Sequence, residues 1–214
     1  MPMKKNLDII VYEKIKDSLV SGEYLPGGKL SVDELSAKYC VSRTPVIQAI
    51  KLLANERILD VKGNGSILVP KYNEKQIRDI CTVRMLVERY AVMEICDRKD
   101  RNAVQKIKEN ALRGNTSFQQ GDYMQFCKDD LHFHETMVSL TGNESLSDVF
   151  HTVQGRLLGV FYLAMCHQPR MIKSAVNEHM ELGERLAKFD KAGAVSLVER
   201  HIFSLRTRLL NPDT

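Results

Sequence analysis

An aspartate and three histidines in the C-terminal part of the chain have the residue types and spacing of a metal site. Asp130 and His134 lie four residues apart in a stretch of helical periodicity, so both side chains project from one helix face. His179 and His201 fall in two later helical stretches. If those helices pack as a bundle, the four side chains can meet in its core. One carboxylate with three imidazoles suits a borderline divalent ion such as zinc or nickel.

The spacing alone leaves a second interpretation open. A histidine on a helix is more often a packed or surface side chain than a ligand, and an Asp-x-x-x-His pair is common on helix surfaces. His132 stands two residues from Asp130 and points elsewhere on the helix. We expect His132, His151 and His167 to be structural or surface residues, because no ligand spacing includes them.

The segments that must position these side chains are predicted to be helices. After residue 73, no stretch alternates as a strand does, and apolar residues recur at helical spacing instead. Gly142-Asn143 and Asn211-Pro212 are helix stop signals. We therefore predict an all-α antiparallel bundle. Its helices are expected at about Glu74–Cys96, Arg101–Asn110 with an extension toward Gly114, Tyr123–Thr141, Glu144–Met165, Pro169–Phe189 and Ala192–Leu210.

Residues 31–69 have the pattern of two short helices followed by a β-hairpin. Ser31 can cap a helix over residues 32–39, and Glu34 would complete a capping box. Ser42 can cap the next helix. The buried stripe of that helix is formed by apolar residues at helical spacing, namely Val46, Ala49, Ile50 and Leu53.

The face opposite this stripe is polar and basic, and the hairpin has a glycine-rich tip. These features predict a winged helix-turn-helix, in which a recognition helix enters the DNA major groove and a wing lies beside it. A small helical domain with a hairpin and no DNA partner is the alternative. The residues expected to contact DNA are Ser42, Arg43, Thr44, Gln48, Lys51, Lys62, Gly63, Asn64 and Gly65.

The composition is that of an ordinary globular protein. The 214 residues are 43% hydrophobic and 27% charged with a formal net charge of +4, which permits a phosphate-facing patch without requiring one. No apolar run is long enough to span a membrane, and the N-terminus lacks the apolar core of a signal peptide. Five scattered cysteines without a CxxC pair indicate reduced thiols in the cytoplasm. We expect two domains, residues 1–72 and 73–214, joined at Pro70–Asn73.

Four short motifs follow one another in the N-terminal part: Gly22–Leu30, Leu35-Ser36-Ala37, Val41–Val46 and Gly63-Asn64-Gly65. In this order they resemble the signature of GntR-family bacterial transcription regulators over residues 7–70. The resemblance implies binding to double-stranded operator DNA. One position departs from the family pattern, which usually has Arg-Glu after the Pro-Val pair, whereas this chain has Ile47-Gln48. Arg43 is kept, so DNA binding is still expected, with affinity and operator sequence open.

Four further motifs lie in the helical part: Asp130–His134, Thr141–Leu146, Glu178-His179 and Arg200–Ile202. They resemble the FCD domain, the effector-binding and dimerisation domain of the FadR-type branch of these regulators. Arg84–Glu88 is similar to the family's Arg-x-x-Leu-Glu pattern, except that Val87 replaces leucine. The resemblance implies that a divalent metal, zinc or nickel, is held by Asp130, His134, His179 and His201.

A six-coordinate ion held by four protein groups keeps two positions open, and these can accept a bidentate carboxylate. A nearby arginine would complete such a site by charge-assisted hydrogen bonds. Arg84 is the first candidate, because it stands in an apolar run and in the family motif; alternatively it forms a surface ion pair with Glu88. Arg156 and Asn177 are weaker candidates for the same pocket. The family implies a small organic acid as the effector.

These observations predict a homodimeric, ligand-responsive transcription regulator that is not an enzyme and has no membrane partner. A metal-dependent hydrolase domain and a direct metal sensor, each fused to the DNA-binding head, are the alternatives. The hydrolase has no HExxH motif or nucleophile elbow in its favour.

Overall fold

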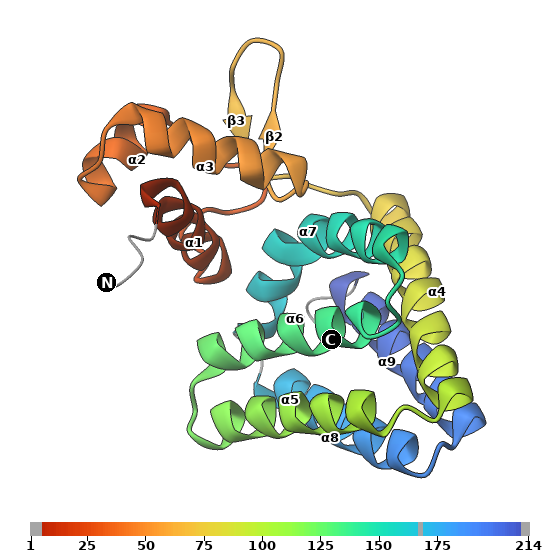
Figure 1. Cartoon of the computed structure of the whole chain (residues 1–214). Coiled ribbons are helices and arrows are strands. Elements are labelled where there is room, and N and C mark those ends of the chain that lie inside the picture. The colour runs from red at the N-terminus through yellow and green to blue at the C-terminus, as the bar shows by residue number, and fades with distance from the viewer. Residues whose placement is uncertain (1–5, 167–168, 211–214) are drawn as a thin grey trace. The chain divides into compact units, whose positions relative to one another are not determined.

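The computed structural model describes residues 6–166 and 169–210, without the side chains of residues 159–169. Its contacts divide the chain into two compact units (Figure 1). The first extends to Lys71 and includes residues 155–163, and the second contains residues 72–154 and those from 164 onward. In the described residues, no helix is both long and apolar enough to cross a membrane.

The first unit is a winged helix-turn-helix, as predicted. Its elements are α1 (Leu7–Val20), β1 (Lys29–Leu30), α2 (Val32–Tyr39), α3 (Arg43–Asn55), β2 (Asp60–Val61) and β3 (Ile67–Leu68). Helix α1 packs against α3, and the core between them contains Ile15, Leu19, Val46 and Leu53. The strands form an antiparallel sheet in the order β1-β3-β2, in which Val61 pairs with Ile67. The sequence predicted the β2–β3 hairpin but missed β1, a strand of two residues.

The two predicted helix caps of this unit are only partly confirmed. The Ser31 side chain accepts a hydrogen bond from the Glu34 backbone N–H at 3.5 Å, which is half of the predicted capping box. Ser42 occupies the predicted N-cap position of α3 with an extended backbone, but its side chain makes no capping hydrogen bond. Cys40 ends α2 in the left-handed conformation at φ 54°, which turns the chain toward α3.

The second unit is all-α, which confirms the predicted bundle. Asn73 and Gln76 form a capping box at the start of its first helix. Helix α4 packs along α9, α5 packs against both α6 and α8, and α8 also contacts α9 (Figure 1). The helices are α4 (Glu74–Arg98), α5 (Arg101–Gln119), α6 (Tyr123–Ser139), α7 (Glu144–Cys166), α8 (Pro169–Ala187) and α9 (Lys191–Leu210).

Helix α5 does not end near Gly114, as the sequence predicted, but continues to Gln119. Gly114 is buried where α5 packs on α6, and a Cβ atom there would lie 3.7 Å from the Phe126 ring. The glycine therefore serves close helix packing and is not a helix stop. Its backbone φ is not positive, so an L-residue is compatible with this position.

We predict that Gly114→Ala stabilises the protein by about 0.5–1 kcal/mol, because alanine is the better helix former and its Cβ would make only ordinary contacts. Urea unfolding followed by circular dichroism measures the change. Gly193→Ala is the matched control, since a Cβ there would lie 2.1 Å from Arg185 Nη1 and 2.1 Å from Asp190 Oδ2 and would disturb their ion pair. A loss of stability for Gly114→Ala equal to that for Gly193→Ala would contradict the assigned packing.

Candidate metal centre and nucleic-acid interface

The four side chains predicted as metal ligands converge in the second unit. Helix α6 supplies Asp130 and His134, α8 supplies His179 and α9 supplies His201. One ring nitrogen of each histidine lies within 4.8 Å of those of the other two. Asp130 Oδ1 lies 3.9 Å from His134 Nε2 and 3.6 Å from His179 Nε2. The four side chains that were expected to meet in the bundle core therefore lie close together.

The imidazoles are packed against one another and against one phenylalanine. The centroid of the His134 ring lies 4.9 Å from that of His179 and 5.1 Å from that of His201. The His179 ring stacks on Phe133 with centroids 4.1 Å apart and planes at 15°. Phe133 is buried, and because its ring stacks on that of His179, it limits the orientations open to His179.

Three of the converging atoms are buried without a hydrogen-bond partner: Asp130 Oδ1, His134 Nε2 and His179 Nε2. They are the only such side-chain atoms found in the described part of the chain. Leaving a buried polar atom unsatisfied costs about 1–3 kcal/mol, so three of them facing one another need an explanation. A divalent cation bound by these atoms would satisfy all three, and the donor set of nitrogen and carboxylate oxygen fits such an ion.

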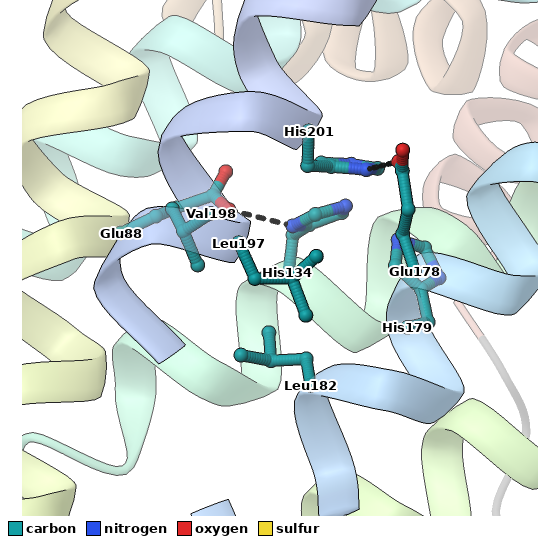
Figure 2. A pocket seen from close by; sticks show the side chains of 8 residues that line it. All are labelled: Glu88, His134, Glu178, His179, Leu182, Leu197, Val198 and His201. Carbon is teal, nitrogen blue, oxygen red and sulfur yellow. Dashed lines mark hydrogen bonds and ion pairs between the residues drawn. The ribbon is translucent and has the colours of Figure 1, made fainter. Parts of the chain in front are cut away.

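Two glutamates pair with the Nδ1 atoms of His134 and His201. Glu88 Oε2 lies 2.8 Å from His134 Nδ1, and Glu178 Oε2 lies 2.6 Å from His201 Nδ1 (Figure 2). Arg84 Nε donates to Glu88 Oε1 at 2.6 Å. Sequence reasoning did not assign this role to either glutamate. The signals available were the i,i+4 spacing of Arg84 and Glu88 and the position of Glu178 next to His179.

Burial and neighbouring charges shift the pKa values of these groups. Burial raises the pKa of Glu88, but His134 and the Arg84 guanidinium outweigh it and lower that pKa from 4.5 to about 2. Burial lowers the pKa of His134 even though Glu88 lies beside it. Burial, repulsion from His134 or His201 when either is protonated, and the Arg84 guanidinium lower the pKa of His179 well below 6.5. His134 and His179 are therefore neutral near pH 7, which is the form that binds metals.

The cavity between these side chains has a volume of about 10 Å³, which is room for about one water-sized sphere. Figure 2 shows its lining, formed by Glu88, His134, Glu178, His179, Leu182, Leu197, Val198 and His201. The predicted effector contacts are not among these residues. Arg84 is buried in its ion pair with Glu88, which is therefore not a surface pair, and both Arg156 and Asn177 are exposed.

The remaining histidines lie outside the cluster where they are described. The His132 side chain is exposed on α6, and its Nε2 lies 3.5 Å from Thr136 Oγ1. His151 is exposed on α7, with Nδ1 3.3 Å from Glu135 Oε1. His167 lies outside the described residues.

All nine residues predicted to contact DNA are exposed in the first unit. Helix α3 buries Val46, Ala49, Ile50 and Leu53 and turns its polar face outward, as its periodicity indicated. Arg43, at the start of α3, forms an ion pair with Asp33 of α2, and both side chains are largely exposed. Ile47, which stands where the family usually has arginine, is 38% exposed and shares the outer part of the helix.

The wing has a tight tip. Lys62 accepts a hydrogen bond at its carbonyl from the Gly65 N–H at 2.8 Å, and its own N–H donates to the Ser66 carbonyl at 2.9 Å. Asn64 Oδ1 accepts from the Ser66 N–H at 3.1 Å. Gly65 has φ +81°, so the tip depends on a glycine at this position. The turn leaves the Lys62 and Asn64 side chains exposed at the end of the hairpin.

Comparison with known families gives two matches. Residues 79–204, more than half of the chain, match the FCD domain. Residues 10–69 match the bacterial regulatory proteins of the gntR family.

Individual relatives agree with these matches. The gluconate operon transcriptional repressor of Bacillus subtilis is 25% identical over 162 residues, which are 76% of this chain and 66% of the repressor's length. The structure of McbR/YncC from E. coli has a TM-score of 0.80 at 20% identity and covers 96% of this chain and 97% of its own. The metal-free FCD domain of TM0439 has a TM-score of 0.56 at 20% identity and covers 66% of this chain and 96% of that domain.

We predict that Glu88→Gln lowers the free energy of unfolding at pH 7 by about 3–5 kcal/mol, because it leaves the Arg84 guanidinium buried without a counter-charge. The folded-state pKa of Glu88, about 2, lies below the ordinary 4.5, so its contribution is present above pH 4.5 and is lost as pH falls toward 2. Between pH 4.5 and 2, the free energy of unfolding of the parent should therefore fall by on the order of 3 kcal/mol more than that of the variant. Urea unfolding at a series of pH values measures this difference.

Glu144→Gln, at an exposed site, is the control and should change stability by less than about 0.5 kcal/mol. If parent and Glu88→Gln lose stability in parallel as pH falls, Glu88 does not carry the assigned charge.

Proposed function

Since the chain belongs to the GntR family of bacterial regulatory proteins and carries an FCD domain, we propose that it is a transcription regulator controlled by a metal-bound small carboxylate. Residues 1–72 would form the DNA-binding domain and residues 73–214 the effector-binding and dimerisation domain. The observation that carries the metal part of the proposal is the convergence of three buried ligand atoms that lack any hydrogen-bond partner.

The proposed metal is a divalent transition ion, zinc or nickel, held by Asp130, His134, His179 and His201. Three imidazoles and one carboxylate favour such an ion over magnesium or calcium. When bound, it would offer open coordination positions and positive charge to an anionic effector. Arg84 is the proposed guanidinium of this site, because its Nε donates to Glu88, which lines the cavity, whereas Arg156 and Asn177 are exposed.

The proposed DNA-binding mode is that of a homodimer in the cytoplasm. Two copies of α3 would enter major grooves about one helical turn apart, and Arg43 and Lys62 would contact bases or phosphates. The relatives named above include a transcriptional repressor, which supports regulation of an operator. A homodimer is proposed because a protein that inserts one short recognition helix into DNA gains affinity when a second copy binds beside it.

Direct sensing of the metal is the second candidate function. The cavity has a volume of about 10 Å³, which suits a single ion and is too small for an organic acid in this arrangement. In that case the ion itself would be the signal, and its removal would change DNA affinity without any carboxylate.

We predict that Arg43→Ala weakens operator binding by about 1–3 kcal/mol, because an arginine at this position can contact guanine with two hydrogen bonds. Lys51→Ala and Lys62→Ala should weaken binding to any DNA and lower the salt slope by about one. Fluorescence anisotropy at matched salt measures both effects. Asp33→Ala is the matched control, since it frees Arg43 from its ion pair and should maintain or raise affinity. Unchanged binding by Arg43→Ala would mean that α3 is not the recognition helix.

Ile47 tests the orientation of the same helix. Ile47→Arg should raise affinity for DNA of any sequence, because the side chain is exposed on α3 and would add a phosphate contact. Titration of non-operator DNA measures this. No change in affinity would place residue 47 away from the duplex.

We predict that His134→Ala, His179→Ala, His201→Ala and Asp130→Ala each lower the metal content and the melting temperature of the metal-loaded protein. Removing one ligand weakens the site, and an ion that binds only the folded state stabilises it by mass action. Elemental analysis after dialysis and thermal unfolding measure the two effects.

Three variants of neighbouring residues control for general damage. His132→Ala and His151→Ala alter exposed histidines and should retain the metal. Asp129→Asn alters a buried carboxylate that accepts from Ser117 and Gln125 and faces away from the cluster, so it should cost stability and keep the metal. Equal metal content in the parent and all four ligand variants would contradict the proposed metal site.

We predict that small carboxylates raise the melting temperature of the metal-loaded protein much more than that of the chelator-treated protein. A ligand at 100 times its Kd stabilises the folded state by about 2.7 kcal/mol, and open coordination positions exist only with the ion present. Thermal unfolding with a panel of mono-, di- and tricarboxylates measures the effect. Equal stabilisation of both forms would place the acid away from the metal.

A further inference from the structure

Arg84, Glu88 and His134 form a buried chain of hydrogen bonds that ends at the cavity. Arg84 Nε donates to Glu88 Oε1 at 2.6 Å, and Glu88 Oε2 lies 2.8 Å from His134 Nδ1. The exposed fractions of these residues are 3%, 0% and 1%. At the end of this series of hydrogen bonds, His134 Nε2 faces the cavity without a hydrogen-bond partner.

We propose that Glu88, held in place by Arg84, is a positioning residue that fixes the tautomer of His134, with the proton on Nδ1 and a free lone pair on Nε2. The tautomer itself does not depend on the proposed function. Only the statement that a metal binds this lone pair rests on it. A carboxylate between an arginine and an imidazole can only accept hydrogen bonds, so Nδ1 must donate. In a neutral imidazole the other nitrogen is then unprotonated, which is the form a metal requires.

A glutamine at position 88 would reverse this tautomer. Its amide has one accepting oxygen and one donating NH2 group, and Arg84 can only donate. The oxygen must therefore face Arg84, and the NH2 group must face His134 Nδ1. His134 Nδ1 then becomes the acceptor, and the proton moves to Nε2, where it points into the cavity and blocks coordination.

The second glutamate lacks this constraint. Glu178 Oε2 lies 2.6 Å from His201 Nδ1, and among the described residues no donor forms a hydrogen bond with its other oxygen. Glu178 and His201 are also more exposed, with side-chain exposures of 14% and 12%. A glutamine at position 178 can turn its oxygen toward His201 and preserve the tautomer. The two chemically identical substitutions should therefore have different effects.

Long-range ¹H–¹⁵N NMR of the metal-free full-length protein reads the tautomer of each histidine, and competition with a chelator measures zinc affinity. We expect His134 to carry its proton on Nδ1 in the parent and on Nε2 in Glu88→Gln, with zinc affinity of the variant about 10–100-fold lower. Glu178→Gln should keep the proton of His201 on Nδ1 and should lower zinc affinity less than Glu88→Gln does.

Removing the arginine should rescue the glutamine. In Arg84→Met/Glu88→Gln, the amide oxygen is free to face His134, so the proton should return to Nδ1 and zinc affinity should rise about tenfold or more above Glu88→Gln. A purely structural role for Arg84 predicts the opposite, since a second core substitution would add to the damage. If Glu88→Gln does not fold, the double variant Arg84→Met/Glu88→Met takes its place in the comparison. Like Arg84→Met/Glu88→Gln it has no buried charge at these positions, but it offers His134 Nδ1 no acceptor. It should therefore bind zinc more weakly than Arg84→Met/Glu88→Gln.

Asp129→Asn is the control for altering a buried carboxylate of the bundle, and it should leave the His134 tautomer and zinc affinity unchanged. A proton that stays on Nδ1 in Glu88→Gln, or a double variant without rescue, would overturn the proposal. If the tautomers respond as expected but the parent binds no zinc, the positioning role stands and the proposed metal function fails.

Discussion

The helical unit buries three candidate ligand atoms that no side chain or backbone group in the described part of the chain satisfies. Asp130 Oδ1, His134 Nε2 and His179 Nε2 face one another without a donor, and each such atom costs about 1–3 kcal/mol when it is left unpaired. Helices α6, α8 and α9 all contribute to the cluster, and α4 supports it through Glu88. The packing of four helices is thus tied to what occupies one small cavity, so the stability of the unit and the occupancy of the site are linked.

Helix α4 connects this cluster to the rest of the chain. It begins at Glu74, directly after the residues that follow the wing, and it presents Arg84 and Glu88 one turn apart on its buried face. Helix α9, which carries His201, packs along α4. A change at the cavity therefore acts on the first helix after the DNA-binding unit. Any effect on DNA binding is limited to the difference in ligand affinity between the DNA-competent and incompetent states.

The sequence predicted the parts of this protein that follow from periodicity and residue type. The stripe of α3 and the Asp130–His134 spacing each depend on local geometry, so both could be recognised without a structure. The role of Glu88 depends on how α4 meets α6, which no local pattern encodes. The sequence predicted that α5 extends only toward Gly114, whereas the helix continues to Gln119, because packing of Gly114 against Phe126 outweighs the weak helix propensity of glycine. Residue type alone indicated Arg156 and Asn177 as effector contacts, and both are exposed.

The size of the cavity limits how any effector can reach the cluster. A volume of about 10 Å³ accommodates an ion or a water molecule, so an organic acid requires a lining side chain to move. Moving Glu88 would separate a fully buried ion pair, which costs several kcal/mol, whereas Glu178 and His201 are partly exposed and form a single hydrogen bond with each other. The side of the cavity between α8 and α9 is therefore the one that opens at lower cost. The apparent affinity for an acid is reduced by the fraction of molecules in which that side is closed, so substitutions that loosen the Glu178–His201 contact would strengthen acid binding as long as the site keeps its metal.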